Sequence, residues 1–367
     1  MIPEVRPRVL QVERRPAEVR TPGSRYTGVR TVAVARLDRL GDVVLSLPAL
    51  AALRAGYPGA RLAVLVRESL VPLIRMVEGV DDAIGVGPGA GRLAARLGAI
   101  EPDLLVCISR GPAPAWAGVR ARVRHRVGAG HRFYSVLFER RVDEHRRGGG
   151  RHEVEYALSF AHRAGAAAGP ERFGIVVPDG AERSTADWLQ SRGLGRAGFV
   201  VLHPGSGGSC PSWPAESWAR LVTLLRDAGR QAVISLGPGD AATGAAFDAA
   251  AGAAREAPRF SAGLAELAAL ARRAAAFAGN NTGPLHLAAA VRAPVLGLYA
   301  PWATCGASRW GPYSGNGWAL VADSAAGSRW TRRRRRRDGS ALLAAVTPET
   351  VAGCLLDLAA GRPVRVG

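Results

Sequence analysis

Short apolar strands alternate with helical segments twice along this chain, and this repeated alternation constrains the fold more than any other feature. Strands that alternate with helices pair through βαβ units and form parallel sheets. The pattern predicts an α/β protein with two Rossmann-like domains, whose parallel sheets we expect to face each other across a cleft. The predicted strands are Thr31–Leu37, Arg61–Val66, Asp82–Val86, Asp103–Ile108, Phe199–Leu202, Gln231–Leu236, Ala275–Ala278 and Pro294–Tyr299.

The 367 residues suffice for two domains of ordinary size. We predict a poorly ordered lead over residues 1–28, a first Rossmann-like domain over 29–178, a second over 179–346, and a closing helix with a tail over 347–367. Residues 322–341 interrupt the second domain and contain six consecutive arginines, Arg332–Arg337, which repel one another. A solvated surface loop is the prediction for this insertion, with a docking site as the alternative.

Basic residues outnumber acidic ones by 49 to 30, and all of them are arginine, because the sequence contains no lysine. Two explanations stay open. One is the coding bias of a GC-rich genome. The other is a surface that attracts nucleotide diphosphates, phosphorylated glycans or an anionic membrane, since arginine binds phosphate through a bidentate fork.

Cysteine usage and apolar runs bear on location. The four cysteines lie far apart without a CxxC spacing, which argues against a zinc site or a disulfide framework and suits a reducing cytoplasm. Charges occur throughout residues 4–20 and no apolar run reaches the ~20 residues of a membrane span, so we expect neither a signal peptide nor a transmembrane helix. The prediction is a cytoplasmic protein in peripheral contact with the anionic inner face of the membrane.

Three loops that follow predicted strands carry residues suited to sugar and phosphate chemistry. The first, Arg36–Asp42 (RLDRLGD), has a glycine that allows a tight turn and places Asp42 at the start of a helix. An aspartate there is either an N-cap or a carboxylate presented to a ligand at the carboxyl end of the strand.

The second loop, His203–Ser209 (HPGSGGS), allows several backbone N–H groups to converge on an anion, although many such loops are only turns. The third, Gly279–His286 (GNNTGPLH), places Thr282 as an N-cap and Pro284 in the first turn of a helix. The free N–H groups and the dipole of that helix favour a diphosphate. A capped helix with a packed His286 is the alternative.

Taken together, RLDRLGDVVLSLPAL, HPGSGGSCPSWP and GNNTGPLHLAAA, in this order and at this spacing, resemble the family 9 glycosyltransferases, the lipopolysaccharide heptosyltransferases and their relatives. The resemblance covers roughly Val29 to Pro312. It implies a GT-B fold and inverting transfer of a sugar from a donor such as ADP-heptose to a saccharide acceptor such as the lipopolysaccharide core. It implies no essential metal or other cofactor.

The resemblance also assigns roles to residues. Asp42 is implied as the general base that deprotonates the acceptor hydroxyl. The acceptor, expected to be anionic, is predicted to contact Arg36, Arg39 and Arg110 in the first domain, where arginines are frequent over residues 110–150. The residues implied in donor binding are His203, Gly205, Ser206, Gly207, Asp240, Asn281, Thr282, Gly283 and His286.

Two positions depart from the family pattern. Pro211 and Ser212 stand where the family commonly has a lysine before Trp-Pro, and Asn281 stands where it commonly has an acidic residue. These departures leave open a degenerate member or a shifted donor. The alternative function is such a member acting on a secondary-metabolite scaffold. Arg309 is a candidate for supplying the missing positive charge.

The sequence bears on two other classes of function. A nucleic-acid or polyanion-binding protein accounts for the net charge of +19, but the chain has no recognition-helix or zinc spacing and only 6% aromatic residues. A sugar-nucleotide epimerase or dehydrogenase needs a GxGxxG after the first strand, where this chain has RLDRLGD.

Overall fold

The computed structural model describes residues 4–12, 24–143, 150–166, 173–208, 210–250, 252–302, 304–325 and 329–365. The chain forms two compact units: an N-terminal unit of residues 15–176, and a C-terminal unit that combines residues 1–14 with residues 177–367. The chain passes between the units at Val176–Val177, close to the predicted boundary between residues 178 and 179.

The N-terminal unit is built on a parallel sheet with the strand order β4-β3-β2-β5-β6-β7. The order reverses between β2 and β5, and in open α/β sheets ligands bind beyond the carboxyl ends of strands at such a point. Its strands are β2 (Thr31–Ala35), β3 (Arg61–Arg67), β4 (Asp82–Val86), β5 (Leu104–Cys107), β6 (His125–Ala129) and β7 (Arg140–Val142). Its helices are α1 (Leu40–Val44), α2 (Leu47–Gly56), η1 (Glu68–Leu70), α3 (Val71–Ile74), α4 (Ala90–Ile100), α5 (Ala113–Arg120), η2 (Phe133–Leu137) and α6 (Glu153–Arg163).

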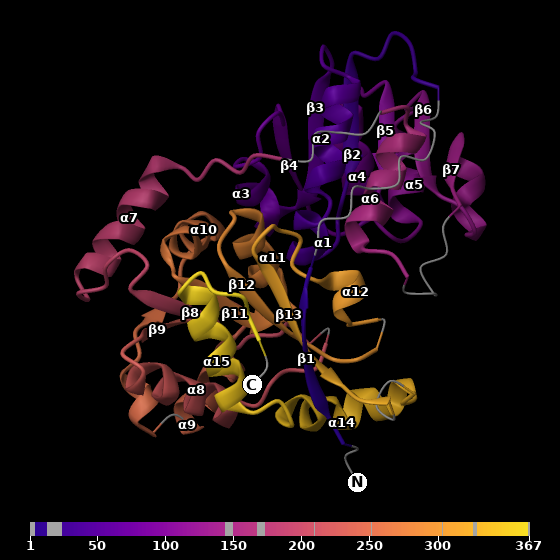
Figure 1. Cartoon of the computed structure of the whole chain (residues 1–367). Helices are drawn as coiled ribbons and strands as arrows, with labels where there is room; N and C mark the ends of the chain where they lie inside the picture. Colours follow the sequence, from indigo (N-terminus) through magenta and orange to yellow (C-terminus); the bar gives the residue numbers. More distant parts are fainter. Residues whose placement is uncertain are drawn as a thin grey trace. The chain divides into compact units, whose positions relative to one another are not determined.

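The C-terminal unit has the strand order β1-β13-β12-β11-β8-β9-β10, and every pair except β1 with β13 is parallel (Figure 1). Its order reverses between β8 and β11. Its strands are β1 (Arg6–Gln11), β8 (Phe199–His203), β9 (Gln231–Ser235), β10 (Arg259–Phe260), β11 (Ala276–Asn280), β12 (Val295–Tyr299) and β13 (Gly317–Asp323). Its helices are α7 (Asp179–Gln190), α8 (Ala215–Asp227), α9 (Ala241–Ala250), η4 (Gly252–Glu256), α10 (Leu264–Arg273), α11 (Gly283–Ala290), α12 (Ala307–Trp310), α14 (Arg332–Ala344) and α15 (Pro348–Ala359).

Strand β1 corrects the prediction of a poorly ordered lead. It pairs antiparallel with β13, and Arg8 Nη1 lies 3.0 Å from the carboxylate of Asp323. Val9 packs against the core of the C-terminal unit, and Figure 1 shows the indigo strand β1 alongside the orange β13. An edge strand of this kind forms only against its distant partner. Residues 13–23 of the lead lie outside the described residues.

Helix α14 corrects the prediction of a loop over residues 322–341, because the arginine run forms the first turns of a helix. The Thr331 side chain accepts a hydrogen bond from the backbone N–H of Arg334 and caps it. The Arg334 guanidinium stacks over the Trp330 ring at 4.5 Å. Arginine is a strong helix former, and these contacts outweigh the repulsion within the run.

The predicted closing helix is confirmed as α15. Thr347 caps it, and it packs against α8 and β11, with Val351 and Leu355 in the core of the C-terminal unit. Within the described ranges, no single helix is long and apolar enough to cross a membrane. One pair, Arg337–Ala344 with Pro348–Ala359, meets the length and composition criteria only when both helices are counted across their 65° bend.

Candidate functional site

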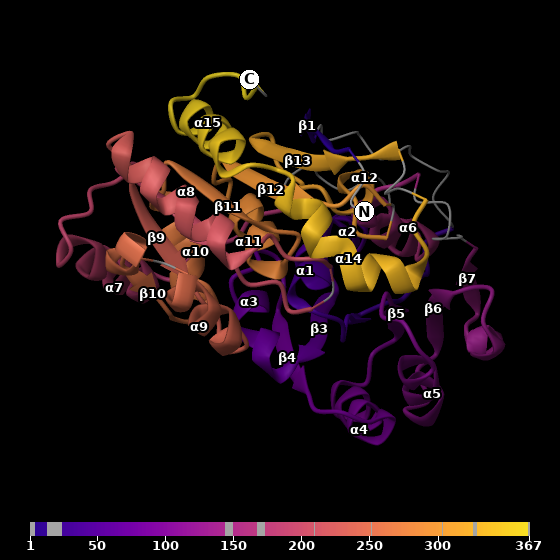
Figure 2. The same ribbon diagram turned by 90° about the horizontal axis from the view of Figure 1, so that it is seen from below.

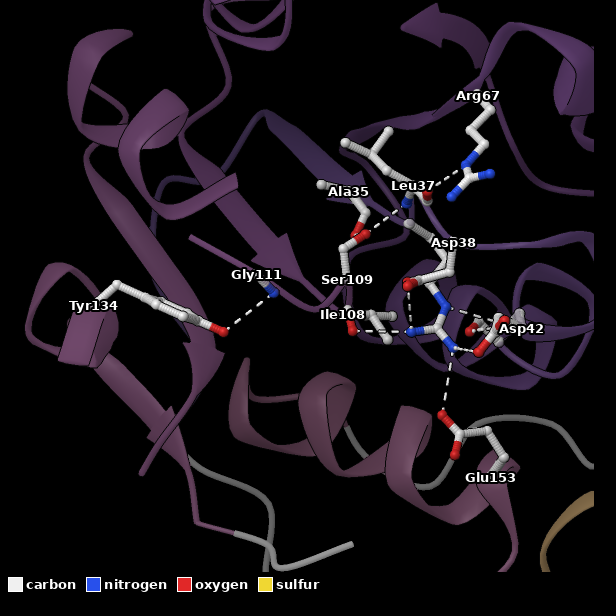
Figure 3. Close-up of polar contacts among 12 residues, drawn as sticks. Ala35, Leu37, Asp38, Asp42, Arg67, Ile108, Ser109, Gly111, Tyr134 and Glu153 are labelled. Carbon is white, nitrogen blue, oxygen red and sulfur yellow. Dashed lines mark hydrogen bonds and ion pairs between the residues drawn. The ribbon is translucent and has the colours of Figure 1, made fainter. Parts of the chain in front are cut away.

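Asp42 lies in the first turn of α1, just beyond the carboxyl end of β2. Arg39 occupies the N-cap position of this helix, so the alternative that Asp42 serves as the N-cap is wrong. Figure 3 shows the carboxylates of Asp42 and Glu153 converging on one guanidinium, that of Arg36.

Arg36 gathers three carboxylates around its buried guanidinium. Its Nη1 lies 3.1 Å from Asp38 Oδ2, and its Nη2 lies 3.3 Å from Asp42 Oδ1 and 3.4 Å from Glu153 Oε1. Nη1 also donates to the backbone oxygen of Ile108 at 3.0 Å. Since Ile108 follows β5, these contacts join the two loops at the point where the strand order of the N-terminal unit reverses.

Glu153 is a site residue that the sequence analysis missed. Its side chain is 1% exposed, and it forms an ion pair with Arg36, which lies 117 residues away in the sequence. Helical spacing in the sequence could have identified Glu153 as a buried residue, because it falls on the same face of α6 as the buried Ala157 and Ala161. An acidic residue on an apolar helix face is retained where a cation pairs with it.

The surroundings of Asp42 change its acidity. Burial raises the pKa of Asp42 above the ordinary value for aspartate, the charge of Arg36 lowers it, and the negative charges of Asp38 and Glu153 raise it again. The net effect is a raised pKa. A carboxylate with a raised pKa accepts a proton more readily than a solvated aspartate, which suits a general base.

Of the three predicted acceptor contacts, the structure corrects one. Arg36 is 1% exposed, and its guanidinium is committed to the neighbouring carboxylates, so it holds Asp42 rather than reaching an acceptor. Arg39 and Arg110 are exposed and follow β2 and β5. Their predicted contact with an acceptor stays a prediction.

The second and third loops lie at the equivalent point of the C-terminal unit. β8 ends at His203 and the adjacent parallel strand β11 ends at Asn280. Asn280, which the sequence analysis missed, is fully buried and hydrogen-bonds to the backbone at the start of the second loop and at Trp213, beyond its end. Its Oδ1 accepts from the backbone N–H of Trp213 at 2.9 Å, and its Nδ2 donates to the backbone oxygen of Pro204 at 2.8 Å.

His203, Gly205 and Asp240 come together as predicted for one site. A Cβ on Gly205 would lie 2.3 Å from Asp240 Oδ1, so a larger residue there would require the Asp240 side chain to move. Asp240 Oδ2 accepts from the backbone N–H of Gly237 at 2.8 Å and lies 3.7 Å from His203 Nε2. Burial lowers the pKa of His203, against the opposing charge of Asp240, and this favours the neutral ring.

The second loop turns through left-handed glycines. Gly207 has φ 55° and Gly208 has φ 70°, and the backbone N–H of Gly208 donates to Ser206 Oγ at 3.3 Å. Successive N–H groups in such a turn form an anion-binding concavity. Ser209 lies outside the described residues.

The third loop differs from the prediction in two details. Thr282 stands at the N-cap of α11, but its hydroxyl donates to the backbone oxygen of Asn280 at 3.3 Å and does not cap the helix that Gly283 begins. His286 is 2% exposed, which supports the alternative of a packed histidine over a direct donor contact. Asn281 Nδ2 donates to the backbone oxygen of Cys305 at 3.1 Å.

Comparison with known proteins decides the family. Residues 113–334 match the model of glycosyltransferase family 9 (heptosyltransferase). This chain belongs to that family. Lipopolysaccharide heptosyltransferase 3 of Escherichia coli is 24% identical over 281 residues, which cover 71% of this chain and 79% of that protein.

Two solved structures share the fold of this glycosyltransferase. A family 9 glycosyl transferase from Veillonella parvula has a TM-score of 0.73 at 18% identity, over 94% of this chain and 99% of that one. The ADP-heptose lipopolysaccharide heptosyltransferase II of E. coli has a TM-score of 0.71 at 22% identity, over 90% and 99%. The predicted GT-B fold is confirmed.

The family 9 enzyme contains a disulfide between Cys210 and Cys305, and this corrects the prediction that its cysteines form no such bond. The bond ties the second loop to the loop after β12, across 95 residues of sequence. Cys107 and Cys354 are free and buried. Sequence spacing did not reveal the pair, because the two loops meet only when β8, β11 and β12 are adjacent.

Helix α14 covers the position of the missing lysine. The backbone N–H of Ser212 donates to Ser340 Oγ at 3.4 Å, and a Cβ on Gly339 would lie 2.6 Å from Pro211 Cγ. Arg309, the candidate substitute cation, is 7% exposed and packs over a tryptophan ring, which does not favour that role.

Over the described ranges, no group of three or more His, Cys, Asp or Glu side chains is arranged to hold a metal ion.

Reduction of the disulfide should destabilise this glycosyltransferase. We expect dithiothreitol to lower the free energy of unfolding in urea by about 2–4 kcal/mol, because the open chain gains conformational freedom. The double variant Cys210→Ser/Cys305→Ser should start at the lower stability and show no response to the reductant. Four reactive thiols in the unreduced, denatured wild type, instead of the two expected, would contradict the prediction.

Proposed function

We propose that this glycosyltransferase inverts the anomeric centre of its donor and transfers heptose from ADP-heptose to an anionic saccharide such as the lipopolysaccharide core. One observation carries the proposal: in each unit, the residues suited to the reaction lie where the strand order reverses, Asp42 after β2 and the two glycine-rich loops after β8 and β11. Family membership and the likeness to a lipopolysaccharide heptosyltransferase support the choice of sugar.

In the proposed reaction, Asp42 takes the proton of the acceptor hydroxyl while that oxygen attacks the anomeric carbon of the donor. The bond between this carbon and the diphosphate oxygen breaks, and the nucleotide diphosphate leaves with the electron pair. Arg36 keeps the Asp42 carboxylate in place, because it also donates to the backbone oxygen of Asp42 at 3.2 Å.

The loops of the C-terminal unit are proposed to hold the departing diphosphate. No side chain caps the start of α11, and the left-handed turn at Gly207 and Gly208 brings successive backbone N–H groups together. Preorganised donors of this kind stabilise developing negative charge. We propose that no metal or other cofactor is needed. The donor contact of Asp240 and the cytoplasmic location stay predictions.

The test is a transfer assay with the full-length chain. ADP-heptose and a panel of other nucleotide sugars are each incubated with deacylated lipopolysaccharide core, and both nucleotide diphosphate release and product mass are measured. We expect turnover with ADP-heptose that is sensitive to Asp42→Asn.

Other results identify the alternatives. Turnover with a different nucleotide sugar indicates a shifted donor, which the proline at 211 and the asparagine at 281 leave open. No diphosphate release with any donor, together with retained polyanion binding, contradicts an active enzyme and favours the degenerate or non-enzymatic alternative.

A further inference from the structure

In the described part of the N-terminal unit, most of the exposed large apolar side chains belong to α5 and η2. Six large hydrophobic side chains are exposed among the described residues, and four of these belong to α5 and η2. Their exposed fractions are 53% for Trp116, 38% for Val119, 80% for Phe133 and 70% for Val136. The two elements pack against each other. Large contiguous exposed apolar patches mark interaction sites.

The two elements hold these side chains on a packed base. Trp116 and Val119 are three residues apart on α5, and Phe133 and Val136 are three apart on η2, so each pair lies along one side of its helix. Between them, Tyr134 is buried with Ala115 in one core cluster, and its hydroxyl accepts from the backbone N–H of Gly111 at 3.2 Å.

The position of α5 is fixed as well. It packs along α4, and both Figure 1 and Figure 2 show these helices side by side. The α5–η2 surface, defined as Trp116, Val119, Phe133, Val136 and the exposed arginines around them, is therefore a feature of the folded unit.

Arginines predominate among the charged residues of this part of the chain. Residues 104–138 contain six arginines and no aspartate or glutamate. Arg126 is tied to the backbone oxygen of Leu137 at 2.8 Å. The other five are exposed: Arg110, Arg120, Arg122, Arg124 and Arg132.

This combination fits the boundary of a lipid bilayer. Tryptophan and phenylalanine partition into the interfacial region, arginine stems reach along apolar surface, and each basic side chain gains attraction from anionic headgroups. A duplex nucleic acid would meet the arginines but leaves Phe133 and Val136 without a role. We propose that the α5–η2 surface docks this enzyme on an anionic membrane. The proposal does not rest on the choice of donor or acceptor.

The test is flotation of the full-length chain with vesicles. We expect it to bind vesicles of phosphatidylcholine with phosphatidylglycerol, to bind pure phosphatidylcholine weakly, and to be released by salt. Phe133→Ser/Val136→Ser should weaken binding by about tenfold or more, because it removes the inserting apolar groups. The matched control is Val176→Ser, which alters an exposed valine outside this surface.

A second pair of variants tests which arginines attract the lipid. Arg120→Gln/Arg122→Gln should weaken binding to the anionic vesicles, whereas Arg332→Gln/Arg333→Gln, on the exposed start of α14, should change it little. Loss of binding only in the α14 variant overturns the proposal, and so does equal binding by the wild type and the Phe133→Ser/Val136→Ser variant. Self-association abolished by that variant, without vesicle binding, also overturns it. Transfer to a soluble acceptor should be retained in all these variants, which separates this proposal from the proposed function.

Discussion

Asp42→Asn should lower kcat for glycosyl transfer by about 10²–10⁴-fold while the protein stays folded, because an amide cannot accept the proton of the acceptor hydroxyl. Asparagine keeps the size of aspartate and can still accept a hydrogen bond from Arg36, which lies 3.3 Å from Oδ1. The measurement is steady-state transfer at saturating donor, with circular dichroism to verify folding.

Asp38→Asn is the matched control for this prediction. Asp38 pairs with the same guanidinium at 3.1 Å, so its loss perturbs the cluster without removing the proposed base. We expect kcat to fall by less than about tenfold. Equal activity losses in the two variants would indicate a general role of the cluster and would remove Asp42 from the proposed mechanism.

The pH profile gives an independent readout of the same carboxylate. Transfer should decline as the pH falls through the pKa of Asp42, and burial raises that pKa above the ordinary value for aspartate. The charge of Asp38 also raises this pKa. Asp38→Asn should therefore move the acidic limb of the profile to lower pH, a shift that a purely structural change would not produce.

Arg36→Met should lower the free energy of unfolding by about 3–5 kcal/mol, because it removes the cation that compensates the buried carboxylate of Glu153. Urea denaturation measures this loss. The exposed Arg110→Met is the control and should alter stability by no more than about 0.5 kcal/mol.

The double variant Arg36→Met/Glu153→Gln identifies the cause of that loss. We expect it to recover about 1–3 kcal/mol, because the glutamine removes the buried negative charge that Arg36 compensates. A double variant that recovers no stability contradicts the assignment.

Local sequence patterns were enough to place the strands and most of the site loops. The β-branched run before Arg36 predicted β2, and the glycines after His203 predicted a turn at the end of β8, because a buried parallel strand and the turn that follows it depend on neighbouring residues. Asp42 could be named from its motif for the same reason.

Residues joined across the chain were not predictable in this way. β1 exists through its pairing with β13, Glu153 meets Arg36 across 117 residues, and the Cys210–Cys305 disulfide spans 95. The helical state of α14 likewise depends on its packing over Trp330. Local sequence patterns determined which segments become strands, helices and glycine turns. Only the tertiary structure decided which charge pairs with which, because ion pairs, disulfides and edge strands draw their energy from partners that the fold brings into contact.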